Sequence, residues 1–380
     1  MNWKISLFKM YWDTQDIVAV TNVIKRGTYW TMGPEIQALE DNIASFIGKK
    51  YGVSYNSGTS ALHATLLAYD IKNGDQVIVP SFTFIATANV VVLTGATPVF
   101  ADIEKQSYAL DPEDVKEKIT NKTKAIVPIH YGGGPCKNIK ALQEIAEDHH
   151  LLLLEDAAES LGAKIHNKRV GTFGDAAMFS FCQNKVITAG EGGIIVTDSK
   201  SITEKLQLIR SHGRVESKEG YFATTQELDY IQAGYNYRLP SINAALVLSQ
   251  FKKFDRIIQM RREKAVYYTK KLSKIKNIRT PAESKDEYHV YQLYTIELPD
   301  KKTRNHLQQH LTKAGIMTKV YFEPIHLKTF YIKKFHYKKN DLPITEEMAE
   351  KVLTLPLYPA LTKKEMDCII SVIEKGCRST

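Results

Sequence analysis

The chain has 380 residues, 43% of them hydrophobic and 24% charged, which is typical of a soluble globular protein and long enough for two domains. Its net charge of +9 comes without a basic helix or an aromatic-basic stripe, so a nucleic-acid partner is not predicted. The sequence also has no apolar run of about 18 residues, no signal-peptide pattern and no metal-ligand spacing among its four cysteines, so we expect a cytoplasmic protein with reduced thiols and no membrane contact or metal.

Short apolar runs alternate with helical patterns over the first 240 residues. Several runs are apolar throughout, as in strands buried on both faces of a mainly parallel sheet. The predicted strands are 76–81, 98–102, 125–130, 151–155, 176–181 and 193–197. Helices are predicted at 61–69, after Asp111 and at 138–148, and Asp111 is followed by a proline and two acids that favour a helix start. This alternation predicts an α/β domain with helices on both faces of the sheet.

The pattern changes near residue 240. Pro240 precedes a stretch that predicts one long helix over 241–272, because no turn signal interrupts it. Beyond this stretch the alternation weakens, with a strand predicted at 291–298 and helices at 304–313 and 363–374. We expect a large domain over 1–250, with an N-terminal arm of about 1–35, and a smaller α+β domain over 251–380.

A single lysine, Lys185, stands in a polar, glycine-rich turn between the runs at 176–181 and 193–197. Burying an ammonium group is costly, so packing alone does not explain a lysine at this point. Lysine forms Schiff bases with pyridoxal phosphate and serves there as nucleophile and base. An ordinary loop lysine is the alternative, and the neighbouring motifs decide between the two.

A phosphate site is predicted upstream of Lys185. Phosphate binding needs backbone N–H donors at a helix N-terminus together with hydroxyl groups. The segment Asn56-Ser-Gly-Thr-Ser60 supplies both before an apolar helix, although a simple helix cap is the alternative for this segment alone. Ser180 adds a hydroxyl only five residues before Lys185.

Two further groups complete a cofactor site. A pyridinium nitrogen stays protonated beside a carboxylate, and Asp156 emerges at the end of the buried run at 151–155, at the sheet edge where α/β proteins bind ligands. Glu155 is the competing acid, but one of two neighbours in a strand points away from the site. Phe82 or Phe84 follows another buried run, and one of them is expected to stack on the ring while the other packs in the core.

Taken together, these motifs resemble the DegT/StrS family of nucleotide-sugar aminotransferases, within pyridoxal phosphate fold type I. The resemblance spans nearly the whole chain in the family's order. The matching segments are Gly27-Thr-Tyr-Trp-Thr-Met-Gly33, Asn56-Ser-Gly-Thr-Ser60, Pro80-Ser-Phe-Thr-Phe84, Glu155-Asp-Ala-Ala-Glu-Ser-Leu-Gly162, Phe179-Ser-Phe181 with Lys185, Gly190-Glu-Gly-Gly193, Gly234-Tyr-Asn-Tyr-Arg238, Pro324-Ile-His326 and Leu355-Pro-Leu-Tyr-Pro359. It implies a large domain with a mainly parallel seven-stranded sheet between helices, and a small C-terminal α+β domain.

The resemblance also implies roles for individual residues. Lys185 would form the Schiff base and move the proton between the α-carbon and C4′ of the cofactor, and Asp156 would pair with the ring nitrogen. Phe84 would stack on the ring, and Glu159 would lie beside the ring O3′. Ser57, Gly58, Thr59 and Ser180 would hold the phosphate, with Asn236 reaching it from the neighbouring subunit of a homodimer. The substrate would lie near Trp30, Thr31, Lys185, Tyr237, Arg238 and His326; Trp30 is otherwise a buried aromatic and His326 a satisfied polar residue.

The implied reaction moves the amino group of L-glutamate to a nucleotide-diphosphate keto sugar, for a surface glycan or a related amino sugar. Glu159 stands where the family often has glutamine or histidine, and it resembles the perosamine-type subgroup that aminates C4 of 4-keto-6-deoxy sugars. Amination at C3 and a cofactor-binding regulator or sensor are the alternatives. A dehydratase relative would carry histidine in place of Lys185, and a Rossmann-type nucleotide site would need a GxGxxG turn that the segment 132–135 lacks.

Overall fold

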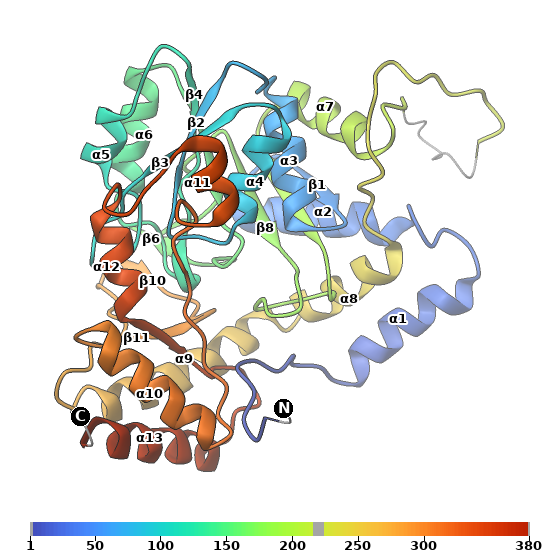
Figure 1. Ribbon diagram of the computed structural model, residues 1–380. Helices are drawn as coiled ribbons and strands as arrows, with labels where there is room; N and C mark the ends of the chain where they lie inside the picture. Colours follow the sequence, from blue (N-terminus) through green and yellow to red (C-terminus); the bar gives the residue numbers. More distant parts are fainter. Residues whose placement is uncertain (1–2, 216–223, 379–380) are drawn as a thin grey trace.

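The computed structural model describes residues 3–215 and 224–378 (Figure 1). The helices are α1 (Thr14–Arg26), α2 (Pro34–Ile47), α3 (Gly58–Ala68), α4 (Ala86–Leu93), α5 (Pro112–Glu117), η1 (Tyr131–Gly133), α6 (Ile139–Asp148), α7 (Lys200–Arg210), α8 (Ser241–Phe251), α9 (Phe254–Leu272), α10 (Lys301–Lys313), α11 (Thr329–Phe335), α12 (Pro343–Lys351) and α13 (Lys363–Arg378). The strands are β1 (Tyr51–Tyr55), β2 (Gln76–Pro80), β3 (Thr97–Ala101), β4 (Thr123–Ile126), β5 (Leu152–Asp156), β6 (Lys164–Ile165), β7 (Lys168–Arg169), β8 (Ala176–Ser180), β9 (Gly193–Thr197), β10 (Glu287–Tyr288), β11 (Tyr294–Glu297) and β12 (Val352–Leu355).

A seven-stranded sheet forms the centre of the molecule, in the order β1-β9-β8-β5-β4-β2-β3. Strand β9 is antiparallel to both of its neighbours, and the pairs from β8 to β3 are parallel. The predicted mainly parallel sheet of fold type I is therefore confirmed. Because parallel strands end at the same edge, the segments that follow β2, β4, β5 and β8 meet at one side of the sheet.

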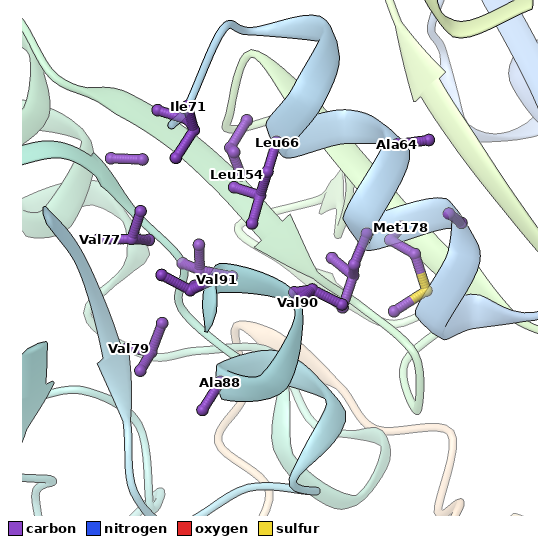
Figure 2. Packing of buried hydrophobic residues seen from close by; sticks show 14 of the residues in the cluster. Ala64, Leu66, Ile71, Val77, Val79, Ala88, Val90, Val91, Leu154 and Met178 are labelled. Atoms are coloured by element: carbon purple, nitrogen blue, oxygen red, sulfur yellow. The ribbon is translucent and has the colours of Figure 1, made fainter. Parts of the chain in front are cut away.

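Alternate side chains along each strand pack against helices on opposite faces, as strand geometry requires. On one face, Val77 and Val79 of β2, Leu154 of β5 and Met178 of β8 point toward helices α3 and α4 (Figure 2). On the other face, Ile126 and Leu153 pack with α5 and α6, while Phe179 and Ile194 pack with α2 and α8. The central sheet is thus buried on both sides, which explains the continuous apolar runs in the sequence.

A second, two-stranded sheet of β11 and β12 carries its own apolar cluster with α9, α10 and α13. The cluster includes Ile5, whose backbone N–H donates to the Gly315 carbonyl oxygen at 3.1 Å. In contrast, Tyr331 of α11 packs against the central sheet, with its hydroxyl 2.8 Å from Asn89 Oδ1. We keep the division at residue 250 as a proposal, in which α11 reaches across from the smaller part to the larger one.

The prediction of one helix over 241–272 was wrong. The helix ends at Phe251, and a second helix begins at Phe254. The Lys253 ammonium lies 2.7 Å from Asp13 Oδ1 and 2.8 Å from Asp16 Oδ2 of α1 and its cap. Lysine gives no turn signal, so this tertiary pairing at the break was not visible in the local pattern.

Strand β1 was absent from the predicted strands because Gly52 and Ser54 weaken its apolar pattern. Both residues are explained by their contacts with Glu40 of the neighbouring helix α2. A Cβ at Gly52 would lie 2.6 Å from the Glu40 carbonyl oxygen, so only glycine fits there. Ser54 donates its hydroxyl to Glu40 Oε1 at 2.7 Å. Over the described part of the chain, none of the helices is both long and apolar enough to cross a membrane.

Candidate active site

Lys185 lies in the loop between β8 and β9, with its side chain 14% exposed. The backbone turns at this point because the Lys185 N–H donates to the Cys182 carbonyl oxygen at 2.9 Å. The Lys185 ammonium lies 3.4 Å from Glu159 Oε1, and Glu159 Oε2 accepts the Gly132 N–H at 2.9 Å. A long polar side chain is therefore held over the sheet edge by a carboxylate that is itself held by the backbone.

Asp156 lies at the end of β5 and is almost fully buried. Its carboxylate accepts the Thr87 hydroxyl at 2.8 Å and the Ala158 N–H at 3.2 Å. Burial raises the pKa of the Asp156 carboxyl, because two hydrogen bonds do not replace the lost water. A buried carboxylate of this kind fits a cationic partner such as a protonated ring nitrogen.

Glu155 points to the opposite side of β5, as expected for one of two neighbours in a strand. Its carboxylate accepts the backbone N–H groups of Gly171, Phe173 and Gly174 at 2.7–2.8 Å and pairs with His130 Nε2 at 2.9 Å. Burial acts to raise the pKa of Glu155, but the hydrogen bonds from His130 and the backbone outweigh it and hold the pKa below its ordinary value. Glu155 is thus a structural anion.

Glu155→Gln should lower the free energy of unfolding by about 3 kcal/mol at pH 7, because an amide N–H₂ would face backbone donors. A group with a lowered folded-state pKa stabilises the fold above its ordinary pKa of 4.5 and loses that effect as the pH falls. The difference between the two proteins should therefore shrink below about pH 4.5. Urea denaturation of both proteins between pH 7 and about pH 4 measures the difference in unfolding free energy. Identical unfolding midpoints at pH 7 would contradict the role given to Glu155.

The predicted phosphate residues come together at the N-terminus of α3. Ser57 caps the helix, with its hydroxyl accepting the Ser60 N–H at 3.0 Å, and Gly58 and Thr59 begin it. A Cβ at Gly58 would lie 3.2 Å from the Ser180 Cβ, so the helix start and the end of β8 are in close contact. The Ser180 hydroxyl accepts the Cys182 N–H at 3.2 Å, which leaves its own proton for another acceptor. Backbone amides and a hydroxyl thus converge as a phosphate group requires.

The two candidate aromatics differ in environment. Phe82 is fully buried and packs with Tyr108 and Tyr131, whereas Phe84 is 62% exposed. Phe82 is therefore the core residue of the pair. Phe84 is the more exposed of the two, and its stacking on the cofactor ring stays a prediction.

The residues predicted near the substrate are more widely spread. Trp30 is 48% exposed and Thr31 is half-buried, and the Trp30 carbonyl oxygen accepts the N–H of Ser241 at the start of α8 at 2.7 Å. From the same first turn of α8, Asn243 donates its side-chain amide to the Ala189 carbonyl oxygen at 2.9 Å. Helix α8 therefore joins the segment of Trp30 to the loop of Lys185.

Asn236, Tyr237 and Arg238 lie between α7 and α8, beside the phosphate residues. The Asn56 N–H donates to the Tyr237 carbonyl oxygen at 2.8 Å, and the Tyr237 hydroxyl lies 3.1 Å from His63 Nδ1 of α3. Asn236 is exposed next to Asn56, and Arg238 is half-buried. Within one chain, this segment therefore contacts the start of α3, which carries the predicted phosphate residues.

His326 has a fully buried side chain. Its Nδ1 lies 2.7 Å from Ser81 Oγ and its Nε2 lies 3.2 Å from Glu346 Oε1. Both ring nitrogens are occupied, which matches the alternative of a satisfied polar residue. Two buried residues that sequence reasoning missed are Thr87 and His130, the partners of Asp156 and Glu155, because no local pattern marks them.

These groups fit pyridoxal 5'-phosphate: a lysine amine, a buried acid whose pKa is raised by burial, an exposed aromatic face and a helix N-terminus with a hydroxyl. When bound, pyridoxal phosphate supplies an aldehyde that exchanges amino groups and a ring that withdraws electrons. Lys185 would hold it, Asp156 would pair with the ring nitrogen, and Gly58, Thr59 and Ser180 would bind its phosphate.

Comparisons with known proteins agree with this fit. The model of the DegT/DnrJ/EryC1/StrS aminotransferase family matches residues 11–374. GDP-perosamine synthase of Escherichia coli O157:H7 is 36% identical over 343 residues, 90% of each chain. The structure of Helicobacter pylori PseC, an aminotransferase involved in the biosynthesis of pseudoaminic acid, superposes with a TM-score of 0.91 at 29% identity over 100% of both chains. The putative sugar aminotransferase Spr1654 from Streptococcus pneumoniae, in its PLP-form, gives a TM-score of 0.90 at 25% identity over 97% of both chains. The chain therefore belongs to the DegT/DnrJ/EryC1/StrS aminotransferase family and is a pyridoxal-phosphate-dependent sugar aminotransferase.

Proposed function

We propose that the protein transfers the amino group of L-glutamate to C4 of a nucleotide-linked 4-keto-6-deoxyhexose, for a surface glycan or related amino sugar. The observation that carries this proposal is Glu159 beside Lys185, with 3.4 Å between carboxylate and ammonium. A glutamate at this position resembles the perosamine-type subgroup, and a GDP-perosamine synthase is among the similar proteins. Amination at C3 is the alternative.

In the proposed reaction, the Lys185 amine would move the proton from the α-carbon of the amino donor to C4′ of the cofactor, and in the second half-reaction from C4′ to the sugar carbon that gains the amino group. Glu159 would orient Lys185 through its contact with the ammonium. Asp156 would keep a positive charge on the ring nitrogen, which lets the ring withdraw electrons from the reacting carbon. Lys185, Trp30, Thr31, Tyr237 and Arg238 remain the proposed substrate contacts. The His326 side chain is buried with both ring nitrogens occupied, so it would affect the substrate only through its neighbours.

The position of the new amino group tests the proposal. The protein is incubated with ¹⁵N-labelled L-glutamate and, separately, with nucleotide-linked 4-keto- and 3-keto-6-deoxyhexoses. We expect ¹⁵N on C4 of the first sugar, read by NMR of the product. If ¹⁵N appears on C3 of the 3-keto sugar and the 4-keto sugar is unchanged, the proposed amination at C4 is wrong and amination at C3 takes its place.

We also propose a homodimer in which Asn236 completes the phosphate site of the partner subunit. Large apolar side chains are exposed in the residues next to Asn236, including Tyr235 and Ile231 at 42% and 58%. Exposed apolar surface of this kind favours a protein interface. A second copy of the chain is the partner that would place Asn236 at another phosphate.

Mixing two inactive variants tests the shared site. A heterodimer of Lys185→Ala and Asn236→Ala chains has one site with both residues intact if Asn236 acts across the interface. The mixture, after exchange of subunits, should then recover about one quarter of wild-type activity. No recovery, with heterodimers shown by mass spectrometry, would place Asn236 in its own chain's site.

A further inference from the structure

The carboxylate of Glu159 depends on a backbone group for its position. Glu159 Oε2 accepts the Gly132 N–H at 2.9 Å, while its Oε1 lies 3.4 Å from the Lys185 ammonium. Gly132 belongs to the segment between β4 and α6, in a left-handed conformation with a φ of 62°. Whatever fixes this segment also fixes the carboxylate that contacts Lys185.

His130 holds both ends of that segment. Its Nδ1 accepts the Cys136 N–H at 2.9 Å, and its carbonyl oxygen accepts the Ser160 hydroxyl at 2.6 Å. The same hydroxyl lies 3.2 Å from the Gly134 carbonyl oxygen. The His130 side chain is fully buried, so water does not compete for these bonds.

The hydrogen bonds also define the tautomer of His130. Because Nδ1 accepts a backbone N–H, the ring proton is on Nε2, which donates to Glu155 Oε2 at 2.9 Å. Glu155 is in turn held by the N–H groups of Gly171, Phe173 and Gly174. The imidazole is therefore fixed to the rigid segment after β7 and cannot rotate without breaking buried bonds.

We propose that His130 is a positioning residue for amino transfer: it fixes the segment 131–136 so that the Gly132 N–H holds Glu159 against Lys185. This inference rests on the proposed roles of Glu159 and Lys185. His130 touches neither group itself. The path from His130 to the ammonium starts at the hydrogen bond with the Cys136 N–H and follows the backbone from Cys136 back to Gly132. It continues through the hydrogen bond of Gly132 to Glu159 and the ion pair of Glu159 with Lys185.

A double-mutant cycle tests this path. His130→Gln keeps a side-chain donor for Glu155 and has no acceptor at the position of Nδ1, which receives the Cys136 N–H, so it should release the segment with little loss of the buried pair. The variants are His130→Gln, Glu159→Ala and the combination, with two readouts: the dissociation constant of pyridoxal phosphate and the rate of reaction with L-glutamate. Tyr268→Phe is the matched control, because it removes an equally buried hydrogen bond, from α9 to the Pro356 carbonyl oxygen, that is not part of the path from His130 to Lys185.

We expect His130→Gln to weaken cofactor binding and slow the reaction about tenfold in the wild-type background, and less than about twofold when Glu159 is alanine. Tyr268→Phe should change the cofactor dissociation constant and the reaction rate by the same small factor in the wild-type and the Glu159→Ala backgrounds. Hydrogen exchange over 131–136, followed by mass spectrometry, should be faster in His130→Gln and unchanged in Tyr268→Phe.

Equal effects of His130→Gln with and without Glu159 would overturn the proposal, since His130 would then act on general stability alone. Unchanged exchange over 131–136 would overturn it as well. If the wild-type protein binds pyridoxal phosphate and does not react with L-glutamate, the proposed donor is wrong, and the cycle on the cofactor dissociation constant decides the role of His130.

Discussion

Lys185→Ala should abolish the visible absorbance of the cofactor's Schiff base and lower the rate of amino transfer by about 10³-fold or more. The substitution removes both the amine that binds the cofactor covalently and the base that moves the proton. The phosphate residues and Asp156 are untouched, so the variant should still bind pyridoxal phosphate, more weakly and without the bond. Visible spectroscopy and a coupled assay for 2-oxoglutarate measure the two effects.

Lys205→Ala is the control for this substitution, because Lys205 is half-exposed and pairs with Asp70 on the surface. It should leave the spectrum and the rate unchanged. A Lys185→Ala protein that keeps the visible band and wild-type turnover would remove Lys185 from the reaction and, with it, the basis of the site.

Asp156→Asn should have the second-largest effect, a loss of about 10²–10³-fold in the rate of amino transfer. An amide in this place cannot keep the ring nitrogen positively charged, so the ring withdraws electrons less strongly. The fold should survive, because asparagine has the same shape and can still accept the Thr87 hydroxyl. A rate within a few-fold of wild type would mean that Asp156 is not the partner of the ring nitrogen.

The same substitution should stabilise the protein prepared without cofactor. Burial raises the pKa of Asp156 above its ordinary value of 3.8, so the charged form costs stability at neutral pH and the cost vanishes as the pH falls. Asp156→Asn should therefore raise the thermal midpoint of the cofactor-free protein at pH 7, by an amount that shrinks toward about pH 4. This is the reverse of the change expected for Glu155→Gln, one residue away.

The sequence predicts the buried strands well because continuous apolar runs report burial on both faces. All six predicted runs overlap strands, and the helix after Asp111 begins at its cap. Strand β1 and the break at Lys253 were missed because both depend on distant partners, Glu40 for the strand and Asp13 and Asp16 for the break. The order of neighbouring residues does not show which distant residues will pair with them.

In the candidate site, too, some features are visible in the local sequence and others depend on residues far apart in the chain. The order of Lys185, Asp156 and the segment 56–60 is visible in the sequence, since the first two follow predicted strands and the segment precedes a predicted helix. The sequence does not reveal that Gly132 holds Glu159, that His130 pairs with Glu155 or that His326 is buried between Ser81 and Glu346. These contacts join residues from different strands and helices, and they decide which polar groups face the cofactor.

Lys185, Asp156 and the start of α3 are proposed to form one working cofactor site for sugar amination. The visible spectrum of the purified protein loaded with pyridoxal phosphate tests this site when it is recorded after L-glutamate and again after a nucleotide-linked 4-keto-6-deoxy sugar. We expect glutamate to bleach the Schiff-base band and the keto sugar to restore it. A protein that forms no such band on reconstitution, or a bleached band that no nucleotide-linked keto sugar restores, would contradict this proposal.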